Sequence, residues 1–384
     1  MTGRERLLRT IRGETTDRVP ISPFLYYNAI YEMFGYQPNI TGGYYDYFYP
    51  RDFDAIGKYV EYCDAFGFDV LHLLGSPWRV YDLSQSGAQW DAVLTESGDD
   101  NIRRREITIT TPGGVLRQTE NVNRSSRYLV VSAIDEHLIK TPADFEAFRK
   151  YGPRADSLDY STVTRSREVT GDKGLACPII HGAFNMLSTF RKLDEVMIDP
   201  LVDEGFYREM IGFFADWVAE RAVKMVQAGA DAVEIGGNMA GSAVGPAFFE
   251  SYVRPYEQRI IDAVHDSGAY LVYHNCGDAA KIMHLYNDMS IDVLGYLTGP
   301  PFGDLNLDEA LQTWKPTMTL RGNIDQVNFM MQASPSQVRQ RVWELLDKVG
   351  ARGRFILSTT DFFFDETPYE NIRAFVNAGV RRED

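Results

Sequence analysis

Short apolar runs alternate with amphipathic helical patterns along almost the whole chain. Eight of the runs have the length and composition of buried strands, and they fall at residues 19–24, 69–74, 176–181, 232–235, 270–274, 291–296, 318–321 and 354–358. Nearly continuous apolar strands separated by helices are typical of a parallel sheet that is covered on both faces. Eight such units therefore predict an α/β protein built as a single (β/α)8 TIM barrel.

The predicted helices carry clear start and stop signals. Residues 334–337 and 367–370 each combine a capping residue, a proline at the first helical position and Gln or Glu at the third. Residues 204–227 form a long amphipathic pattern that Gly229 should end, and a second long helix is expected from residue 246 to 265. The first eight residues mix charged and apolar side chains, which indicates an amphipathic helix rather than a secretory signal.

One region interrupts the alternation of strands and helices. Between residues 78 and 131 the sequence is polar and rich in β-formers, and residues 105–110 and 115–119 flank the turn sequence Thr111-Pro112-Gly113-Gly114. This pattern predicts a β-hairpin inserted after the second strand, where it would cover the barrel mouth. The sequence contains no internal repeat or linker, so residues 1–384 are predicted to form one domain with this insertion.

Composition limits the partners that the chain is expected to have. The net charge is −15, which argues against binding to nucleic acid or to anionic membranes. The sequence has no run of about 18 apolar residues, the length that a membrane span needs. Its three scattered cysteines are too few for a disulfide framework, so a cytoplasmic protein is expected. With nucleic acid and membranes disfavoured, the expected partner is a small molecule.

The strongest chemical signal is the end of the fifth predicted strand, at His274 and Cys276. Residues two apart in a strand point to the same side, so the imidazole and the thiol should face one small volume. Imidazole and thiolate together are good ligands for zinc. The alternative is that Cys276 is only a small buried hydrophobic residue.

Further polar and aromatic residues lie at the predicted carboxyl ends of the strands, where catalytic residues of TIM barrels cluster. They are Tyr26, Tyr27, His181, Glu234, Tyr296, Arg321, Asn323, Asp325, Asp361 and Phe362. Glu234 interrupts an apolar strand, so it is expected either to bind a metal or to pair with a lysine or arginine. Asp361 is a candidate third ligand or a loop cap, and His181 either serves the site or only packs. The aromatic residues are core by default, but grouped at one mouth they would suit a flat ligand.

Several of these segments resemble the uroporphyrinogen decarboxylase superfamily, which includes zinc- and corrinoid-dependent methyltransferases. The segment from His274 to Asp278 is similar to the His-x-Cys-Gly motif of the methyltransferase branch, and residues 320–325 are similar to its Gly-x-Ile/Val-Asp segment. Residues 356–361 and 365–372 resemble the closing segment, in which many members carry a zinc-binding cysteine. The resemblance covers almost the whole chain and implies a barrel enzyme that uses zinc and a corrinoid.

Two departures from the family pattern change what is expected. The decarboxylases have an arginine-rich signature near the N-terminus, whereas residues 24–28 here are Phe-Leu-Tyr-Tyr-Asn, so tetrapyrrole decarboxylation is disfavoured. In addition, Asp361 occupies the place of the closing cysteine. A carboxylate in place of a thiolate makes a zinc site harder and more Lewis acidic, which suits an oxygen ligand. Loss of the metal is the other interpretation of this exchange.

The resulting hypothesis is a zinc-dependent methyltransferase that moves a methyl group between a substrate and a corrinoid (cobalamin). An O-methyl substrate, such as a methoxylated aromatic, is favoured. The expected roles are metal binding by His274, Cys276, Asp361 and, as a candidate fourth ligand, Glu234; catalysis by Glu234, His274 and Asp361; substrate binding by Tyr26, Tyr27, His181, Tyr296, Arg321 and Phe362; and cofactor binding by Asn323 and Asp325.

The sequence leaves three other functions open. They are a methylcobamide:thiol methyltransferase, a metal-free decarboxylase or lyase in which Arg321 and Asp325 handle a carboxylated substrate, and a corrinoid or tetrapyrrole binding protein without chemistry. An Asp-x-His-x-x-Gly stretch of the kind that holds cobalt is absent, so the corrinoid is expected on a separate partner protein. Exposed barrel helices often pair, so a homodimer is among the arrangements left open.

Overall fold

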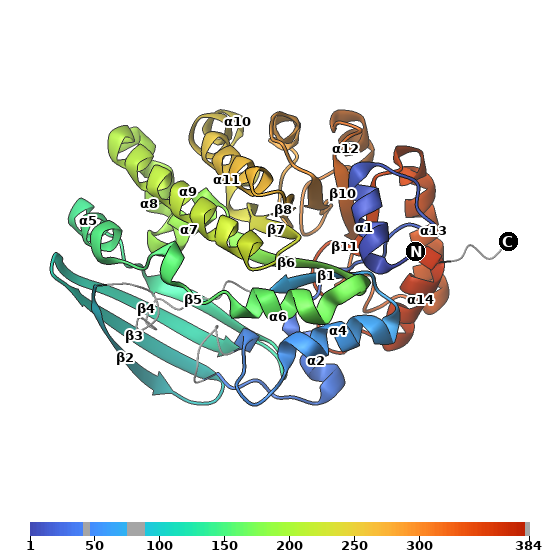
Figure 1. Ribbon diagram of the computed structural model, residues 1–384, viewed down its shortest axis with the longest axis horizontal. Coiled ribbons are helices and arrows are strands. Elements are labelled where there is room, and N and C mark those ends of the chain that lie inside the picture. Colours follow the sequence, from blue (N-terminus) through green and yellow to red (C-terminus); the bar gives the residue numbers. More distant parts are fainter. Residues whose placement is uncertain (41–46, 75–88, 381–384) are drawn as a thin grey trace.

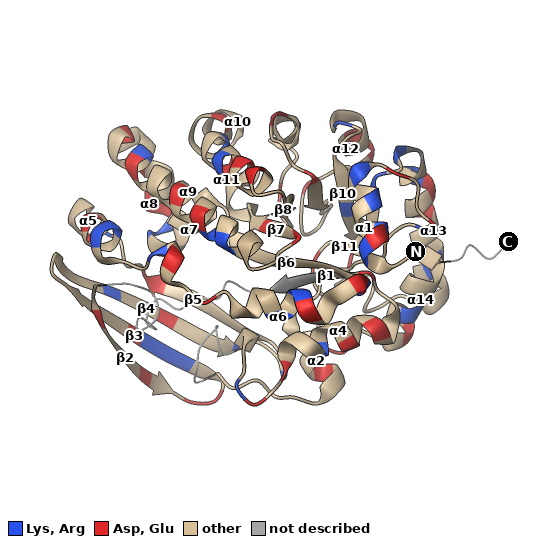
Figure 2. Cartoon of the chain, in the orientation of Figure 1, with Lys and Arg blue, Asp and Glu red and all other residues tan. Residues whose placement is uncertain are grey.

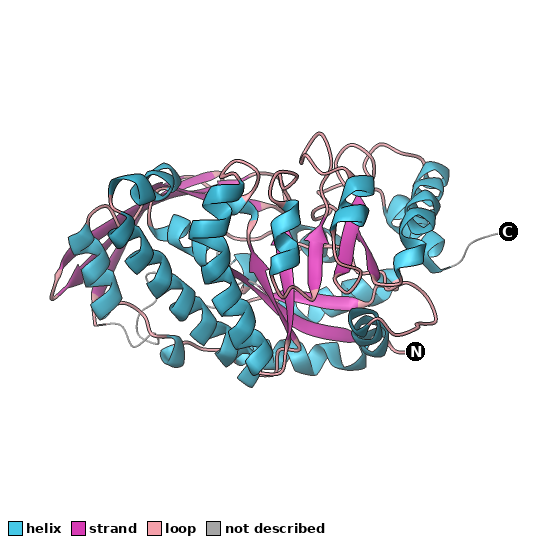
Figure 3. Ribbon diagram, turned by 90° about the horizontal axis from the view of Figure 1, so that it is seen from above, coloured by secondary structure: helices cyan, strands magenta, loops and turns pink. Residues whose placement is uncertain are grey.

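A curled parallel sheet forms the centre of the computed structural model, which describes residues 1–40, 47–74 and 89–380 (Figure 1). Its seven strands are hydrogen-bonded in chain order, and each pairs in parallel with its neighbours. They are β1 (Val70–Leu74), β6 (Gly174–His181), β7 (Ala232–Gly236), β8 (Tyr270–Asn275), β9 (Val293–Tyr296), β10 (Thr319–Ile324) and β11 (Phe355–Thr359). Seen from above, the helices surround these strands (Figure 3).

The first predicted strand is irregular in the structure. Only Ile21 forms a parallel bridge, to Leu357 of β11, and the Ser22 N–H donates to the Leu357 carbonyl at 2.9 Å. On the other side, the Asp69 N–H donates to the Ile21 carbonyl at 2.8 Å. Prolines at positions 20 and 23 lack an N–H donor, which limits regular pairing here. The segment nevertheless joins both edges of the sheet, so the α/β fold is TIM-barrel-like.

The outer layer consists of helices, most of which follow the strands. They are α1 (Gly3–Arg12), α2 (Tyr27–Phe34), α4 (Ala55–Phe66), α5 (Pro142–Tyr151), α6 (Ser161–Thr170), α7 (Ala183–Phe190), α8 (Leu193–Val202), α9 (Glu204–Gln227), α11 (Arg254–Asp266), α12 (Leu307–Thr313), α13 (Pro335–Val349) and α14 (Tyr369–Val380). The cap at Ser334 is a full capping box in which Ser334 and Gln337 bond reciprocally. In the part of the chain that is described, no helix is both long and apolar enough to cross a bilayer.

The helix predicted for residues 246–265 is present, but one of its turns is π-helical. The structure divides it into the short α10 (Pro246–Phe248), a π-helical turn (Phe249–Val253) and α11. Pro255 lies at the start of α11, where its missing N–H does not interrupt a helical hydrogen bond. The wider turn before it therefore accommodates a proline that a continuous helix would not.

The inserted region is a four-stranded antiparallel sheet, which is larger than the hairpin that was expected. Its strands β2 (Asp91–Gly98), β3 (Ile102–Thr111), β4 (Gly114–Arg124) and β5 (Val130–Glu136) pair in chain order. The sheet lies to one side of the parallel sheet (Figure 1). Residues 78–88, where the insertion was predicted to begin, lie outside the described part of the chain.

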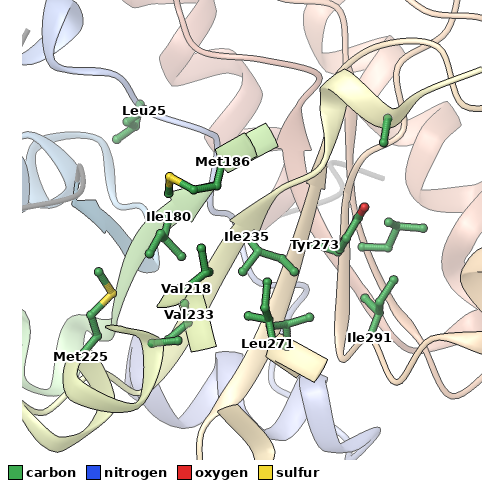
Figure 4. Packing of buried hydrophobic residues seen from close by; sticks show 14 of the residues in the cluster. Leu25, Ile180, Met186, Val218, Met225, Val233, Ile235, Leu271, Tyr273 and Ile291 are labelled. Carbon is green, nitrogen blue, oxygen red and sulfur yellow. The ribbon is translucent and has the colours of Figure 1, made fainter. Parts of the chain in front are cut away.

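Alternation along the strands separates two apolar layers. Ile180, Val233, Ile235 and Leu271 pack outward with side chains of the surrounding helices (Figure 4). Residues of opposite parity form a second cluster inside the curl of the sheet, which includes Leu71, Leu175, Cys177, Ala232, Val272, Val293 and Ile356. Acidic and basic residues are mixed over the outer helices and the inserted sheet (Figure 2).

Candidate active site

Glu234 is the buried polar centre of the inner layer. It has the same parity in β7 as Ala232, so it points to the inside of the sheet, and its side chain is fully buried. His274 Nδ1 donates to Glu234 Oε1 at 2.7 Å, and Arg321 Nη1 lies 3.3 Å from Oε2. The Tyr296 hydroxyl lies 3.2 and 3.3 Å from the two carboxylate oxygens. Glu234 is therefore paired with an arginine and with the candidate ligand His274.

Arg321 and Tyr296 lie in the interior and complete this network. Arg321 Nη1 donates to the Tyr296 hydroxyl at 2.6 Å, and its guanidinium stacks 4.7 Å from the centre of the Tyr296 ring. Arg321 Nε and Nη2 donate to the carbonyls of Ser22 and Pro23, each at 3.1 Å. Both side chains have no exposed surface. The polar contacts of Arg321 and Tyr296 are with each other, with Glu234 and with the backbone, whereas both residues were expected to bind substrate.

The ring of His274 is held on two sides. Phe24 contacts it edge-on with ring centres 5.2 Å apart, and Tyr296 does so at 4.7 Å. Burial lowers the pKa of His274, but Cys276 and the Glu234 carboxylate outweigh this and raise the pKa well above 6.5. Because Nδ1 is bonded to Glu234, Nε2 is the ring nitrogen left for a ligand.

Cys276 and Asp361 lie beside His274, in the segments that follow two different strands, β8 and β11. Both side chains are half-buried, and the Cys276 thiol interacts with His274 and with Asp361. Burial raises the pKa of Asp361, although the charge of His274, the Phe362 N–H and Cys276 act in the opposite direction. Within the described residues, no group of three or more His, Cys, Asp or Glu side chains is arranged to hold a metal ion. The donors are thus neighbours, but they do not converge on one point.

His181 ends β6 with its side chain exposed. Its Nδ1 lies 3.0 Å from the Thr189 hydroxyl oxygen, and that hydroxyl donates its one proton to the Asn185 carbonyl at 3.0 Å. Nδ1 must therefore carry the proton, which leaves Nε2 as an acceptor. Desolvation by the surrounding protein and the charges of Arg221 and His274 lower the pKa of His181.

The remaining predicted residues divide into two groups. Tyr26 and Phe362 are half-buried and pack with ring centres 5.0 Å apart, so they form an aromatic pair near Phe24. Tyr27 is fully buried in the core instead, against Tyr31, Phe48 and Tyr59.

Asn323 and Asp325 serve the backbone of their own region. Asn323 Nδ2 donates to the Leu297 carbonyl at 3.1 Å. Asp325 Oδ1 accepts from the N–H groups of Val327 and Asn328 at 2.8 and 2.9 Å, as expected of a loop cap. These contacts are structural, and the cofactor binding expected of both residues stays a prediction.

Gln326 was missed by the sequence analysis. Its side chain is buried, and Oε1 accepts from the Thr360 hydroxyl at 2.5 Å and from the Asp361 N–H at 3.1 Å. It therefore fixes the backbone that carries Asp361. The only sequence signal was an amide residue directly after Asp325, in a loop without periodicity.

Comparison with known proteins identifies the family. The model of the family "Uroporphyrinogen decarboxylase (URO-D)" matches residues 130–381, and the chain belongs to this family, as its motifs indicated. The uroporphyrinogen decarboxylase of Solibacter usitatus is 27% identical over 174 residues, which are 45% of this chain and 48% of that protein. The chain thus spans about half the length of this curated decarboxylase.

Methyltransferases are also among the relatives. The methylcobamide:CoM methyltransferase MtbA of Methanosarcina mazei is 22% identical over 249 residues, covering 64% of this chain and 70% of that protein. A solved methyltransferase from Methanosarcina mazei superposes with a TM-score of 0.67 at 15% identity and covers 98% of both chains. This similarity shows that the two proteins share a fold.

Proposed function

We propose that the protein is a zinc-dependent methyltransferase that moves a methyl group between a small substrate and a corrinoid on a partner protein. The observation that carries the proposal is the orientation of His274, whose Nδ1 is held by a buried carboxylate, so that Nε2 is the nitrogen that could bind a metal. Ligating histidines usually donate their second N–H to such a carboxylate, which fixes the ring and its tautomer. The methyltransferase relatives support the same reaction class.

The donor chemistry at this site fits a zinc ion. His274, Cys276 and Asp361 would supply nitrogen, sulfur and oxygen ligands, and three protein ligands leave one position for substrate. Glu234 takes the role of orienting His274, because its oxygens face His274, Tyr296 and Arg321 and have no exposed surface. When bound, zinc would act as a Lewis acid on the substrate heteroatom that gives up its methyl group.

The chain's own residues would select and orient the substrate. Asp361 in place of a second thiolate favours an oxygen ligand, and therefore an O-methyl group. Tyr26 and Phe362 offer half-buried aromatic surface against which a flat methoxylated ring would pack. This packing would hold the methyl carbon in one position and orientation, which favours its transfer.

Two alternative functions, a metal-free decarboxylase and a thiol-methylating enzyme, receive less support from the contacts of the candidate residues. A metal-free decarboxylase that uses Arg321 and Asp325 on a carboxylated substrate requires groups that are already bonded to the protein. A thiol-methylating enzyme of the usual kind requires a second thiolate, but Cys63 and Cys177 are buried at 2% and 0% exposure.

Two measurements test the proposal. Purified protein should contain about one zinc per chain, and His274→Ala should lose it. An assay with free cob(I)alamin and a panel of methyl ethers, methylamines and methyl thiols should give demethylation of ethers. Absence of zinc under zinc-replete conditions would reject the metal mechanism, and activity confined to thiols would reject the oxygen substrate.

A further inference from the structure

The segment that follows Cys276 is tied to two neighbouring loops by a single carboxylate, Asp304. Asp304 Oδ1 accepts from the N–H groups of Ala279 and Ala280 at 2.6 and 2.8 Å, and Oδ2 accepts from the Ser242 hydroxyl at 2.7 Å. The three partners belong to the loops after β7 and β8, and Asp304 belongs to the loop after β9. One side chain therefore connects three successive loops at the same end of the sheet.

The loop after β7 reinforces this connection. The Ser242 N–H donates to the Asp278 carbonyl at 2.8 Å, and the Lys281 N–H lies 3.3 Å from the Ser242 hydroxyl oxygen. A Cβ on Gly241 would lie 2.3 Å from the Asp278 carbonyl oxygen, so only glycine permits this approach. Although burial of Asp304 acts to raise its pKa, the N–H groups of Ala279 and Ala280 and the Ser242 hydroxyl lower it below 3.8, which keeps the acceptor charged.

The other side of Cys276 is fixed by Asn275. Its Oδ1 accepts from the Gly277 N–H at 2.9 Å, and its Nδ2 donates to the buried Tyr286 hydroxyl at 2.8 Å. Cys276 therefore lies between two anchors, of which the Asp304 anchor is the one that depends on other loops. Its thiol lies beside His274 and Asp361.

We propose that Asp304 is a positioning residue for Cys276: its three hydrogen bonds fix the turn after the strand and hence the direction of the thiol. The consequence for metal affinity rests on the proposed function, but the positioning of the thiol does not. Loss of a group that holds a metal ligand in place typically changes metal affinity by roughly 10- to 100-fold.

The chain offers a direct reporter of this effect. Of its three cysteines, Cys63 and Cys177 are buried and Cys276 is the accessible one, so alkylation of the native protein reports on Cys276. In metal-free protein, Asp304→Ala should be alkylated several-fold faster than the wild type. Asp304→Asn, which keeps an oxygen acceptor, should restore most of the slow rate, and Ser242→Ala should lie between.

Asp278→Ala is the matched control, because it removes an exposed carboxylate from the same turn while leaving the hydrogen bond to its carbonyl in place. Its alkylation rate should stay close to that of the wild type. Equal rates in Asp304→Ala and the wild type, or equal acceleration in Asp278→Ala, would overturn the proposal. If Asp304→Ala unfolds, all three thiols will react, and Ser242→Ala and Asp304→Asn then decide the question.

A second arm measures how much zinc protects Cys276 from alkylation. The zinc concentration needed for half-protection should rise by roughly tenfold or more in Asp304→Ala. If zinc protects neither protein, the metal mechanism fails, while the rates without metal still decide the role of Asp304. If zinc protects both equally well, Asp304 does not position the ligand.

Discussion

The inner network and the rim of the candidate site are built in different ways. Glu234, Tyr296 and Arg321 have no exposed surface, and their polar contacts are satisfied within the strands and the first segment. Cys276 and Asp361 are half-buried and are held through loops, by Asn275 and Asp304 on one side and Gln326 on the other. The comparison teaches that the orientation of His274 is fixed by the fold itself, whereas its partner ligands depend on loops that can be altered one at a time.

The largest effect is expected where the inner network is broken. Glu234→Gln should lower the free energy of unfolding by about 3–5 kcal/mol, because it leaves Arg321 charged and buried without its counter-ion. Chemical denaturation with a fitted midpoint and slope measures the change. The double variant Glu234→Gln/Arg321→Met serves as the control and should recover part of the loss. A stability change below about 1 kcal/mol would contradict the view of the network as an ion-paired core.

A second buried carboxylate, that of Glu257, has surroundings that differ from those of Glu234. Glu257 of α11 is also fully buried, but its Oε1 accepts from the Phe184 N–H at 3.4 Å, and within the described residues Oε2 has no hydrogen-bond partner. Desolvation raises its pKa from 4.5 to about 8. The folded chain thus keeps this proton up to about pH 8, whereas the unfolded chain releases it near 4.5.

Glu257 should therefore reduce stability as the pH rises between these two values. The folded state binds the extra proton in this window, so the free energy of unfolding should fall by about 1.4 kcal/mol per pH unit. Glu257→Gln should remove this contribution, and the difference between variant and wild type should grow from pH 5 to pH 8 and then level off. Denaturation at four pH values measures it, and a difference that does not change with pH would refute the raised pKa.

At the rim, Asp361→Cys tests whether the carboxylate sets substrate preference. A second thiolate makes the metal softer, so the ratio of ether to thiol turnover should fall by roughly tenfold, or about 1.4 kcal/mol in relative barrier. Asp361 is half-buried and makes none of the hydrogen bonds of the inner network, so the midpoint of denaturation should change little. Asp361→Asn is the control, since it removes the charge without adding a thiolate. An unchanged ratio in Asp361→Cys would mean that the metal ligands do not select the substrate.

The smallest effect is expected at His181. Thr189→Val removes the acceptor that holds Nδ1–H, while Thr189→Ser keeps the hydroxyl. Loss of one net hydrogen bond corresponds to roughly a two- to tenfold change, which should appear in KM with kcat unchanged. If Thr189→Ser behaves like Thr189→Val, the hydroxyl is not what orients the ring.

The sequence predicted the regular strands and helices of this molecule. Apolar runs and capping signals located the strands and helices, and α9 begins and ends where its pattern does. The π-helical turn before α11 was missed, because its cause is a single Pro255 within an otherwise good helical pattern. The extent of the inserted sheet was also missed, since β2 and β5 carry weaker alternation than the two strands between them.

For the site, the sequence indicated residue types and strand ends, but not which groups bond to which. The pairing of Glu234 with Arg321 joins positions 87 residues apart, and no local pattern encodes it. Asp304 and Gln326 lie in irregular loops, where neither periodicity nor a motif marks them. The presence of zinc, the corrinoid and the methyl donor stay predictions.

The irregular first strand has a consequence for the buried charge of Arg321. Because the segment does not continue as a regular strand beyond its bridge at Ile21, the carbonyls of Ser22 and Pro23 turn to the guanidinium of Arg321. The segment that joins the two sheet edges thus also supplies the carbonyls that hold the buried guanidinium of Arg321. An engineered variant with a regular β-strand in this first segment would close the barrel more uniformly. It would also leave the buried guanidinium of Arg321 without the carbonyls that now accept its hydrogen bonds.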